Sequence, residues 1–417
     1  MRVLHVTHQY HPAIGGAERY ITDVSEALAR RGHVVDVYTS QSRDYHTWRN
    51  ELPPFERING VNVHRFRSLP RGPLAWRLLE IGLRNHTEYR LPLFAPHIFV
   101  GNGPVCPQLF LAMLRHAPGY DLIHINQLHY AHAWTAYVAA KARGRPIVLT
   151  PHIHVEQPQT YDVGYLWRIL RGSDAVLADT AGERAFLAQK LPGQLVVQCG
   201  KGLTMADFPP RNVPASRRHF GLPDDGFVLL FLGRKTEYKG LAQVLRAFTQ
   251  LRQQRDKLYL LAVGPETEHS EQLWRTYGGA EGLVVRGAVT EEERLDALAA
   301  CDLLALPSVG EAFGIVYLEA WAYGKPVIGA NIQSVASLID DGVDGLLVDP
   351  QRPGQLLDAM QRLVDDGALA RQMGAQGNRK LKQRFTTDHF TDVTEGVYRQ
   401  VIRRANHGAQ RPQRAAT

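Results

Sequence analysis

Short apolar runs alternate along the chain with longer segments in which apolar residues recur at helical spacing. In the first half this pattern predicts strands at Val3–Val6, Val34–Tyr38, Val61–Phe66, Leu122–Ile125, Ile147–Thr150, Ala175–Ala178 and Leu195–Val197, and helices at Ala17–Arg30, Ala131–Arg143 and Gly182–Lys190. In the second half it predicts strands at Phe227–Leu232, Leu258–Val263, Leu283–Val285, Leu303–Leu306, Pro326–Gly329 and Gly345–Val348, and helices at Leu241–Leu251, Glu291–Ala300, Ile315–Tyr323 and Gly354–Val364. Apolar strands that alternate with helices are typical of parallel sheets covered on both faces. The sequence therefore predicts the α/β fold class.

The alternation is interrupted at residues 200–225, where Pro, Gly, Asp and Arg accumulate without clear periodicity. Because more than 400 residues are too many for one doubly wound sheet, we predict two Rossmann-like domains that face a central cleft. The first domain is placed at residues 1–200 and the second at residues 201–385. Residues 386–417 are predicted to form a C-terminal helix that packs back on the first domain, followed by a loose tail from residue 408.

The composition excludes several classes of protein. Of the 417 residues, 44% are hydrophobic and 21% are charged, which is ordinary for a globular chain. Cys106, Cys199 and Cys301 are far apart and form no C-x-x-C pair, so they predict neither a disulfide framework nor a zinc site and favour a reducing compartment. The first apolar stretch is too short for a signal peptide, and no window reaches the roughly 18 apolar residues of a membrane span. We therefore expect a cytoplasmic protein.

The net charge of +7 is concentrated in the first domain. Residues 1–200 contain 21 basic and 15 acidic side chains, and residues 57–90 alone contain seven arginines and two glutamates. Such a patch attracts polyanions in general, and an ordinary solvated surface fits the same charge pattern. No recognisable nucleic-acid-binding module accompanies the charge, so we expect no nucleic-acid partner.

The segment Gly233–Gly240 directly follows the first predicted strand of the second domain. Open α/β sheets bind ligands at the carboxyl ends of their strands, which is where this segment places Arg234 and Lys239. An arginine supplies a planar fork of donors and a lysine supplies a point charge, so the two together suit two phosphates. A pair of surface cations is the alternative interpretation.

The segment Glu311–Glu319 lies between a predicted strand and a predicted helix. Glu311 falls in the loop and Glu319 lies two turns into the helix, so both carboxylates can face one cleft. Carboxylates accept hydrogen bonds from sugar and ribose hydroxyls. Gly314 and Ile315 add free backbone N–H groups at the predicted helix start, where an anion can bind.

Two further candidates follow strands of the first domain. Gly15 and Gly16 lie between the first strand and the first helix, where glycine lets the backbone approach a diphosphate closely; a tight turn is the alternative. His152 and His154 follow the strand Ile147–Thr150, and His152 could face the cleft floor. The spacing of these histidines provides no convincing set of metal ligands, so we expect no metal. His124, His129 and His132 could line an acceptor pocket or be structural.

Three motifs together resemble those of a known family. They read G-G-A-E at Gly15–Glu18, G-R-x4-K-G at Gly233–Gly240, and E-A-F-G-I-V-Y-L-E at Glu311–Glu319. The sequence thereby resembles the retaining GT-B glycosyltransferases of glycosyltransferase family 4, whose signature is E-x7-E and which use nucleotide-sugar donors. The resemblance spans nearly the whole chain and is most specific in residues 227–350. The family's hinge, usually P-N-G-V-D, reads here as Cys199–Leu203.

The resemblance implies roles for the candidate residues. The implied catalytic residues are Glu311 on the donor sugar, Arg234 and Lys239 on the departing diphosphate, and His152 near the sugar 6-position. The residues implied in donor binding are Gly15, Gly16, Val289, Phe313, Gly314, Ile315 and Glu319. Gly16 would approach the diphosphate, Glu319 would contact the ribose, and Val289 would lie in the base-contacting segment. The first domain would bind the acceptor. Neither a metal nor another cofactor is implied, because protein cations neutralise the leaving group.

The expected reaction moves a hexose-type sugar from a UDP- or GDP-sugar to a hydroxyl of a glycan or lipid-linked acceptor, in polysaccharide or glycolipid synthesis. No carboxylate is obviously placed as a nucleophile on the opposite sugar face. We therefore prefer same-face attack, in which the leaving phosphate takes the acceptor proton, over double displacement. Two alternatives stay open, namely a non-catalytic nucleotide-sugar-binding protein and a nucleotide-sugar 2-epimerase on the same fold.

Residues 73–90 interleave leucines and Trp76 with Arg77, Arg84 and Arg90. A basic helix with Trp and Leu on its other side could lie on an anionic membrane surface. Because lipid-linked acceptors are common in the family, we expect peripheral attachment to the inner face of the cytoplasmic membrane. A core-facing helix with a solvated back fits the same pattern.

Overall fold

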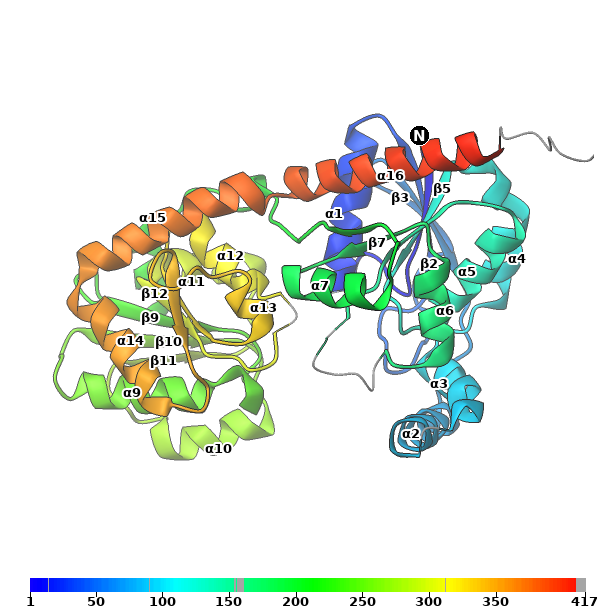
Figure 1. The fold of residues 1–417 in the computed structure, drawn as a ribbon. Helices are drawn as coiled ribbons and strands as arrows, with labels where there is room; N and C mark the ends of the chain where they lie inside the picture. The colour runs from blue at the N-terminus through cyan, green and yellow to red at the C-terminus, as the bar shows by residue number, and fades with distance from the viewer. Residues whose placement is uncertain (14, 90, 154, 156–160, 312, 410–417) are drawn as a thin grey trace, which may run out of the picture. The chain divides into compact units, whose positions relative to one another are not determined.

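The computed structural model describes residues 1–13, 15–89, 91–153, 155, 161–311 and 313–409. Ile14, Arg90, His154, Ala312 and the end of the predicted tail from residue 410 lie outside the described residues. The chain divides into two compact units (Figure 1). The N-terminal unit comprises Met1–Gly200 and Thr387–Thr417, and the C-terminal unit comprises Lys201–Thr386. The sequence places these boundaries between residues 200 and 201 and between residues 385 and 386.

The N-terminal unit is built on a sheet with the order β3-β4-β2-β1-β5-β6-β7-β8. Its strands are β1 (Arg2–Val6), β2 (Val34–Ser40), β3 (Phe55–Ile58), β4 (Val61–Phe66), β5 (Leu122–Asn126), β6 (Ile147–Thr150), β7 (Ala175–Ala178) and β8 (Val196–Gln198). Its helices are α1 (Gly16–Arg30), α2 (Pro73–Glu88), α3 (Ala95–Asn102), α4 (Pro107–His116), α5 (Ala131–Ala142), α6 (Gly164–Gly172), α7 (Ala181–Lys190) and α16 (Thr387–Ala409), with short 3-10 turns η1 (Pro92–Phe94) and η2 (Ala117–Gly119).

The sheet has a hydrophobic core on each face, because successive strand residues point to opposite sides. On β1, Leu4 and Val6 belong to a core that also contains Ala133 of α5 and Leu166 of α6. Val3, between Leu4 and the chain start, belongs to a second core formed with α1 and α16. Such strands are buried on both faces, which explains why they read as continuous apolar runs in the sequence.

Two elements of this unit differ from the prediction. β3 was not predicted, and it pairs antiparallel with β4 while the other neighbouring strands are parallel. Asn59 and Gly60 connect β3 to β4, and both have positive φ (46° and 88°), as a two-residue hairpin turn requires. β8 begins at Val196 rather than at Leu195. The Asn59-Gly60 pair is the sequence signal for the hairpin of β3 and β4, which the periodicity of the apolar residues does not reveal.

The C-terminal unit is built on a sheet with the order β11-β10-β9-β12-β13-β14, and its strands all pair in parallel. The strands are β9 (Phe227–Leu232), β10 (Leu258–Val263), β11 (Leu283–Arg286), β12 (Leu303–Leu306), β13 (Val327–Ala330) and β14 (Gly345–Val348). The helices are α8 (Val213–Phe220), α9 (Leu241–Arg252), α10 (Glu268–Tyr277), α11 (Glu291–Ala300), α12 (Ile315–Ala322), α13 (Gln333–Ala336), α14 (Pro353–Asp365) and α15 (Gly367–Arg384), with 3-10 turns η4 (Met205–Asp207) and η5 (Glu237–Lys239).

The stretch 200–225 is not a plain linker, because it contains the helix α8. The Asn212 side chain accepts a hydrogen bond from the Ala215 N–H at the start of α8, and Gly221 ends the helix in the left-handed conformation. Arg217 is buried; its Nη2 lies 2.8 Å from the Asp302 carboxylate, and its Nε donates to the Ala300 carbonyl. This stretch shows no clear periodicity in the sequence because polar caps and a buried arginine interrupt the apolar pattern of α8.

Each sheet reverses its strand order at one place. In the N-terminal unit the chain moves from β1 to β2 on one side and resumes at β5 on the other side. In the C-terminal unit it moves from β9 to β10 and resumes at β12, which pairs with β9. At such a switch point the loops after two neighbouring strands turn to opposite faces and leave an open crevice at the carboxyl edge. These two positions therefore locate where each unit can bind a ligand.

No single helix in the described ranges is both long and apolar enough to cross a membrane. The pair Ala95–Asn102 and Pro107–Gly119 meets the length and composition only when taken together, and it is bent by 92°.

A chain of buried hydrogen bonds joins α16 to the N-terminal sheet, and its direction can be assigned. Burial lowers the pKa of His5 to about 3, so its ring is neutral and carries one N–H. The Ser25 hydroxyl donates to the Ile21 carbonyl at 2.6 Å, so the Ser25 oxygen accepts from His5 Nδ1 at 2.7 Å. His5 Nε2 therefore accepts from the Tyr398 hydroxyl at 3.0 Å.

The same chain continues through a second histidine. Burial also lowers the pKa of His124 well below its usual value, so this ring is neutral too. Because the Tyr398 proton is directed to His5, the Tyr398 oxygen accepts from His124 Nδ1, and His124 Nε2 accepts from the Thr150 hydroxyl at 2.8 Å. One hydroxyl on α16 thus satisfies a nitrogen of each of two buried rings.

We expect Tyr398→Phe to lower the free energy of unfolding of the N-terminal unit by about 1–3 kcal/mol, because it leaves two buried imidazole nitrogens without their partner. Chemical denaturation followed by intrinsic fluorescence measures the change. Tyr165→Phe is the matched control, since the Tyr165 hydroxyl is buried and has no hydrogen-bond partner in the described part of the chain. Equal losses in the two variants would contradict the assigned hydrogen-bond chain.

Candidate functional site

The loops that follow β9 and β12 are held together at the switch point of the C-terminal sheet. The Val309 N–H donates to the Tyr238 carbonyl at 2.9 Å. Gly240, which begins α9, has φ +82°, and a Cβ added there would lie 2.8 Å from Cγ of Pro307. Only glycine combines this backbone conformation with this close approach. The two loops that contain the predicted donor-binding motifs are therefore neighbours in the fold.

Lys239 and Glu311 form an ion pair between these two loops. Lys239 Nζ contacts Glu311 Oε1, and the two side chains are 17% and 11% exposed. The Ser334 hydroxyl of α13 donates to the Glu311 backbone carbonyl at 2.6 Å, which anchors the loop. The structure thus brings together two residues that are 72 positions apart in the sequence and that the sequence analysis assigned to one site.

Arg234 and Lys235 are adjacent in the sequence but have opposite environments. Arg234 is exposed, and its side chain makes no hydrogen bond or ion pair to any described residue. Lys235 is fully buried, contacts Glu266, and donates to the Arg286 carbonyl at 2.7 Å. Lys235 therefore stabilises the strand ends, while Arg234 leaves a free cation at the carboxyl edge of β9.

The start of α12 lies beside these charges in the same loop. Gly314 has φ +84°, and an added Cβ would lie 2.6 Å from the Tyr317 ring. The Tyr317 hydroxyl donates to the Leu306 carbonyl at 2.7 Å and fixes α12 against β12. Ile315 begins the helix, so its N–H is among the free donors of the first turn. The Phe313 ring is buried, with its centroid 6.1 Å from that of Phe385, and only its backbone can face a ligand.

Glu319 was predicted to meet a ribose, and in the structure it already forms an ion pair with a cation of the chain. Its carboxylate lies 2.6 Å from Arg294 of α11, and Arg294 also contacts Glu291. The sequence around Arg294 carries no signal for this role, because nothing in its helical pattern separates it from a solvated arginine. Val289 is half-buried against the core, just before Thr290 caps α11.

In the N-terminal unit, the first turn of α1 contains an acidic residue, Glu18. The Glu18 carboxylate contacts His8 Nε2 at 2.9 Å. Burial opposes the ionisation of Glu18, but the hydrogen bond and charge of His8 prevail and lower its pKa to about 2. A Cβ added to Gly15 would meet the Glu18 carboxylate, whereas one added to Gly16 would meet nothing within 4 Å. The Glu18 carboxylate thus offsets part of the positive charge at the start of α1, and the space beside Gly16 is open.

His152 is held by two polar side chains. Its Nδ1 lies 2.7 Å from the Asp179 carboxylate, and its Nε2 lies 2.8 Å from Oδ1 of Asn126. The Asn126 amide nitrogen donates to the carbonyl of Ala17, which sets the orientation of the amide. The predicted sugar contact therefore competes with partners inside the unit. Asn126 ends β5 and Asp179 directly follows β7, so their position after apolar strands was the signal that could have found them.

His124 and His132 do not line an acceptor pocket. Both are buried, with 0% and 2% of their surface exposed, and burial lowers both pKa values well below the usual range. His132 Nε2 contacts the Asn126 carbonyl at 2.7 Å, and His124 belongs to the hydrogen-bond chain to Tyr398. The structural interpretation of these two histidines is therefore correct. Among the residues described, no three His, Cys, Asp or Glu side chains converge as metal ligands would.

Two family models match this chain, one in each unit. The sequence model of the glycosyl transferases group 1 matches residues 212–380. The sequence model of the glycosyl transferase 4-like domain matches residues 15–198. A D-inositol 3-phosphate glycosyltransferase from Nocardioides sp. is 29% identical, over 92% of this chain and 85% of that protein. An uncharacterized glycosyltransferase from Methanocaldococcus jannaschii is 25% identical, over 96% and 98% of the two chains.

Solved structures share the fold. Sucrose-phosphate synthase from Thermosynechococcus elongatus has a TM-score of 0.73 at 23% identity and covers 97% of this chain and 100% of that chain. HepE from Anabaena, in complex with UDP and glucose, has a TM-score of 0.68 at 19% identity and covers 95% and 98%. These likenesses confirm the predicted α/β fold with two parallel-sheet units.

Proposed function

This chain belongs to the glycosyl transferases group 1 family of retaining GT-B glycosyltransferases, and we propose that it moves a hexose from a nucleotide diphosphate sugar to an acceptor hydroxyl. In this proposal the C-terminal unit binds the donor and the N-terminal unit binds the acceptor. UDP and GDP are the proposed nucleotides; the Anabaena neighbour was solved with UDP and glucose. The proposed acceptor is a glycan or a lipid-linked sugar in polysaccharide or glycolipid synthesis.

The observation that carries the proposal is the charge at the switch point of the C-terminal sheet. Arg234 has no ion-pair partner among the described residues, Lys239 is paired with Glu311, and the first turn of α12 offers N–H donors within the same loops. A diphosphate can pair with Arg234 and compete with Glu311 for Lys239. Glu311 is then released to accept hydrogen bonds from sugar hydroxyls, as the family resemblance implies. One ion-pair exchange would thus couple phosphate binding to sugar binding.

The reaction separates charge, and the same cations favour that separation. As the bond between the anomeric carbon and the diphosphate oxygen breaks, the oxygen keeps the electron pair and the sugar becomes positive. Arg234 and Lys239 are already in place, so they stabilise the developing negative charge without a cost for reorganising their surroundings. The acceptor oxygen bonds to the anomeric carbon on the same face, and its proton passes to the departing phosphate oxygen. Because protein cations perform the neutralisation, we propose that neither a metal nor another cofactor is required.

Donor screening and product analysis test this function. We expect one class of UDP- or GDP-sugar to raise the thermal midpoint, because a ligand that binds only the folded state stabilises it. With an acceptor present, the proton NMR spectrum of the product should show the anomeric configuration of the donor, and EDTA should not change the rate. No stabilisation by either nucleotide, or an inverted product, would contradict the proposal.

Replacing Arg234 tests the role of the free cation. We expect Arg234→Gln to lower kcat by about 10²–10³-fold, because it removes a preorganised charge from the leaving group, while the thermal midpoint stays unchanged because the side chain has no partner in the described chain. Arg246→Gln on α9 is the matched control, since Arg246 is also exposed and its side chain makes no hydrogen bond or ion pair to another described residue. Steady-state kinetics should separate the two variants; equal rates would contradict the role.

We further propose that α2 and α3 attach the enzyme to the inner face of an anionic cytoplasmic membrane. The two helices lie together at one end of the N-terminal unit (Figure 1). They pack closely through glycines: a Cβ on Gly82 would lie 2.9 Å from Ile98, and one on Gly101 would lie 2.5 Å from Leu79. This pair is therefore a rigid platform rather than a loose appendage. The three cysteines are buried and form no disulfide within the described ranges, which fits a reducing compartment.

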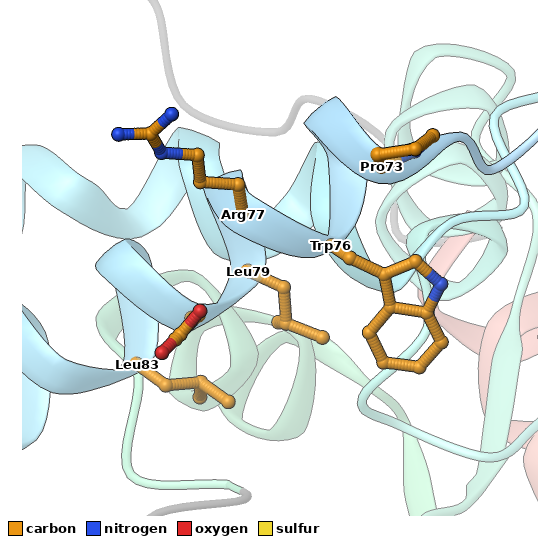
Figure 2. A pocket seen from close by; sticks show the side chains of 6 residues that line it. Pro73, Trp76, Arg77, Leu79 and Leu83 are labelled. Carbon is orange, nitrogen blue, oxygen red and sulfur yellow. The ribbon is translucent and has the colours of Figure 1, made fainter.

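Several leucines on and around α2 are exposed. Leu69 before α2, Leu74 on α2 and Leu93 of η1 are 58%, 71% and 67% exposed. Trp76, Leu79 and Leu83 of α2 line a surface hollow of about 680 Å³, which Glu80 also lines. The Arg77 guanidinium points away from the two leucines (Figure 2). Apolar side chains next to arginines suit a bilayer with anionic headgroups, where the leucines enter the acyl boundary and the arginines meet phosphates.

Vesicle binding tests this attachment. We expect the protein to float with vesicles of anionic phosphatidylglycerol at low salt and not with neutral phosphatidylcholine. The double variant Leu74→Gln/Leu93→Gln should weaken binding about tenfold or more, because two leucines no longer leave water. Val343→Gln is the control, since Val343 is 53% exposed on the C-terminal unit. Absence of flotation at low salt, or equal binding by the double variant, would refute the attachment.

A further inference from the structure

Lys235 is fully buried and joins the ends of three neighbouring strands at the carboxyl edge of the C-terminal sheet. It lies in the loop after β9, and its Nζ contacts the carboxylate of Glu266 in the loop after β10. The same Nζ donates to the carbonyl of Arg286, the last residue of β11, at 2.7 Å. A buried ammonium group is costly unless it is paired and hydrogen-bonded. One side chain therefore holds the ends of β10 and β11 to the loop after β9.

The carboxylate of Glu266 is fixed from its other side by α10. Its Oε2 accepts hydrogen bonds from the Ser270 hydroxyl at 2.7 Å and from the Trp274 indole N–H at 2.9 Å. Burial opposes the ionisation of Glu266, but these hydrogen bonds and the one from Lys235 prevail and lower its pKa. Lys235 Nζ also lies 5.5 Å from the centre of the Trp274 ring. The lysine thus meets an anion that is already oriented, and it has little freedom to leave the Arg286 carbonyl.

This contact sets the direction of the backbone that follows β11. A trans peptide directs its C=O and N–H to opposite sides, so the hydrogen bond to the Arg286 carbonyl also fixes the Gly287 N–H. The Gly264 N–H approaches the carbonyls of both Arg286 and Gly287, at 3.2 and 3.1 Å. Gly287 is exposed, and its own N–H donates to no described residue. At this point the two carbonyls are occupied, while one oriented N–H is available to a ligand.

The nucleoside of the proposed donor is directed to the same loop. Glu319 of α12, the residue implied in ribose contact, forms an ion pair with Arg294 of α11 at 2.6 Å. Residues 287–289 lead from β11 into α11, and the family resemblance places Val289 among them near the base. With the diphosphate at Arg234 after β9 and the ribose beside α11, the base reaches the loop that precedes α11.

We propose that Lys235 is a positioning residue for the choice of base, because it holds the Gly287 N–H toward an exocyclic carbonyl oxygen of the nucleotide. This role rests on the proposed function. Uracil and guanine carry an oxygen at the exocyclic position, whereas cytosine and adenine carry an amino group that is itself a donor. A backbone donor that faces an amino group has no partner, which lowers the affinity. The favoured donors are therefore UDP- and GDP-sugars rather than CDP- and ADP-sugars.

Matched nucleotides test this role. UDP and CDP share the ribose and the diphosphate and differ in the base, as do GDP and ADP. In isothermal titration calorimetry we expect UDP to bind about tenfold more tightly than CDP, or GDP than ADP, because the wrong base leaves a donor unpaired. Lys235→Met should abolish this preference and leave the affinity for CDP and ADP nearly unchanged. Lys257→Met is the control, since Lys257 is exposed, pairs with Asp225 and precedes β10 at the other end of that strand.

A proline tests the backbone donor directly. Gly287→Pro removes the N–H from an exposed position, so we expect the same loss of preference. Gly287→Ala keeps the N–H, and a Cβ added there meets no atom within 4 Å, so this variant should keep the preference. Circular dichroism and the thermal midpoint verify that each variant is folded. If Lys235→Met does not fold, the two variants of Gly287 decide.

The outcomes separate this role from the proposed function. If nucleotides bind without a preference for UDP over CDP or for GDP over ADP, the positioning role is refuted even when sugar transfer is intact. It is also refuted if Lys235→Met keeps the preference, or if that variant weakens all four nucleotides equally, as a merely structural role would. If no nucleoside diphosphate binds the wild-type protein, the proposed function fails and the selection of the base fails with it.

Discussion

The reversal of strand order in a parallel sheet is the constraint on which both units depend. Where neighbouring strands send their following loops to opposite faces, the carboxyl edge stays open, and the residues directly after the strands reach it. Arg234 follows β9, and Glu311 lies in the loop after β12. His152 follows β6, next to Asn126 at the end of β5. Polar and charged side chains that are far apart in sequence therefore lie at one edge of each sheet.

Most charges at these edges are paired before any ligand arrives. Lys239 contacts Glu311, Arg294 contacts Glu319, and His8 contacts Glu18. Such half-buried pairs offset the desolvation of each charge and keep the side chains oriented. An incoming anion can then replace the carboxylate of one such pair and bind a cation that is already oriented. Arg234, which has no carboxylate partner among the described residues, is the exception and suits an incoming phosphate.

The histidines illustrate how the same residue type serves structure and site. His5 and His124 are fully buried and neutral, and they bond α16 to the sheet through a single tyrosine hydroxyl. His152 has a carboxylate neighbour, Asp179, at 2.7 Å and lies at the carboxyl edge. Local sequence does not separate these cases, because each histidine belongs to or follows an apolar strand. Depth in the sheet decides between them.

The sequence by itself determined the α/β class, most strand and helix positions and the three motifs of the family, because apolar periodicity and glycine placement are local properties. It did not determine which charged residues pair. Lys235 and Arg234 are adjacent, yet Lys235 is buried against Glu266 and Arg234 is exposed. Nor did it reveal Arg294, whose ion pair joins it to Glu319 on another helix. Only tertiary packing sets the distances and the burial on which electrostatic partnership depends.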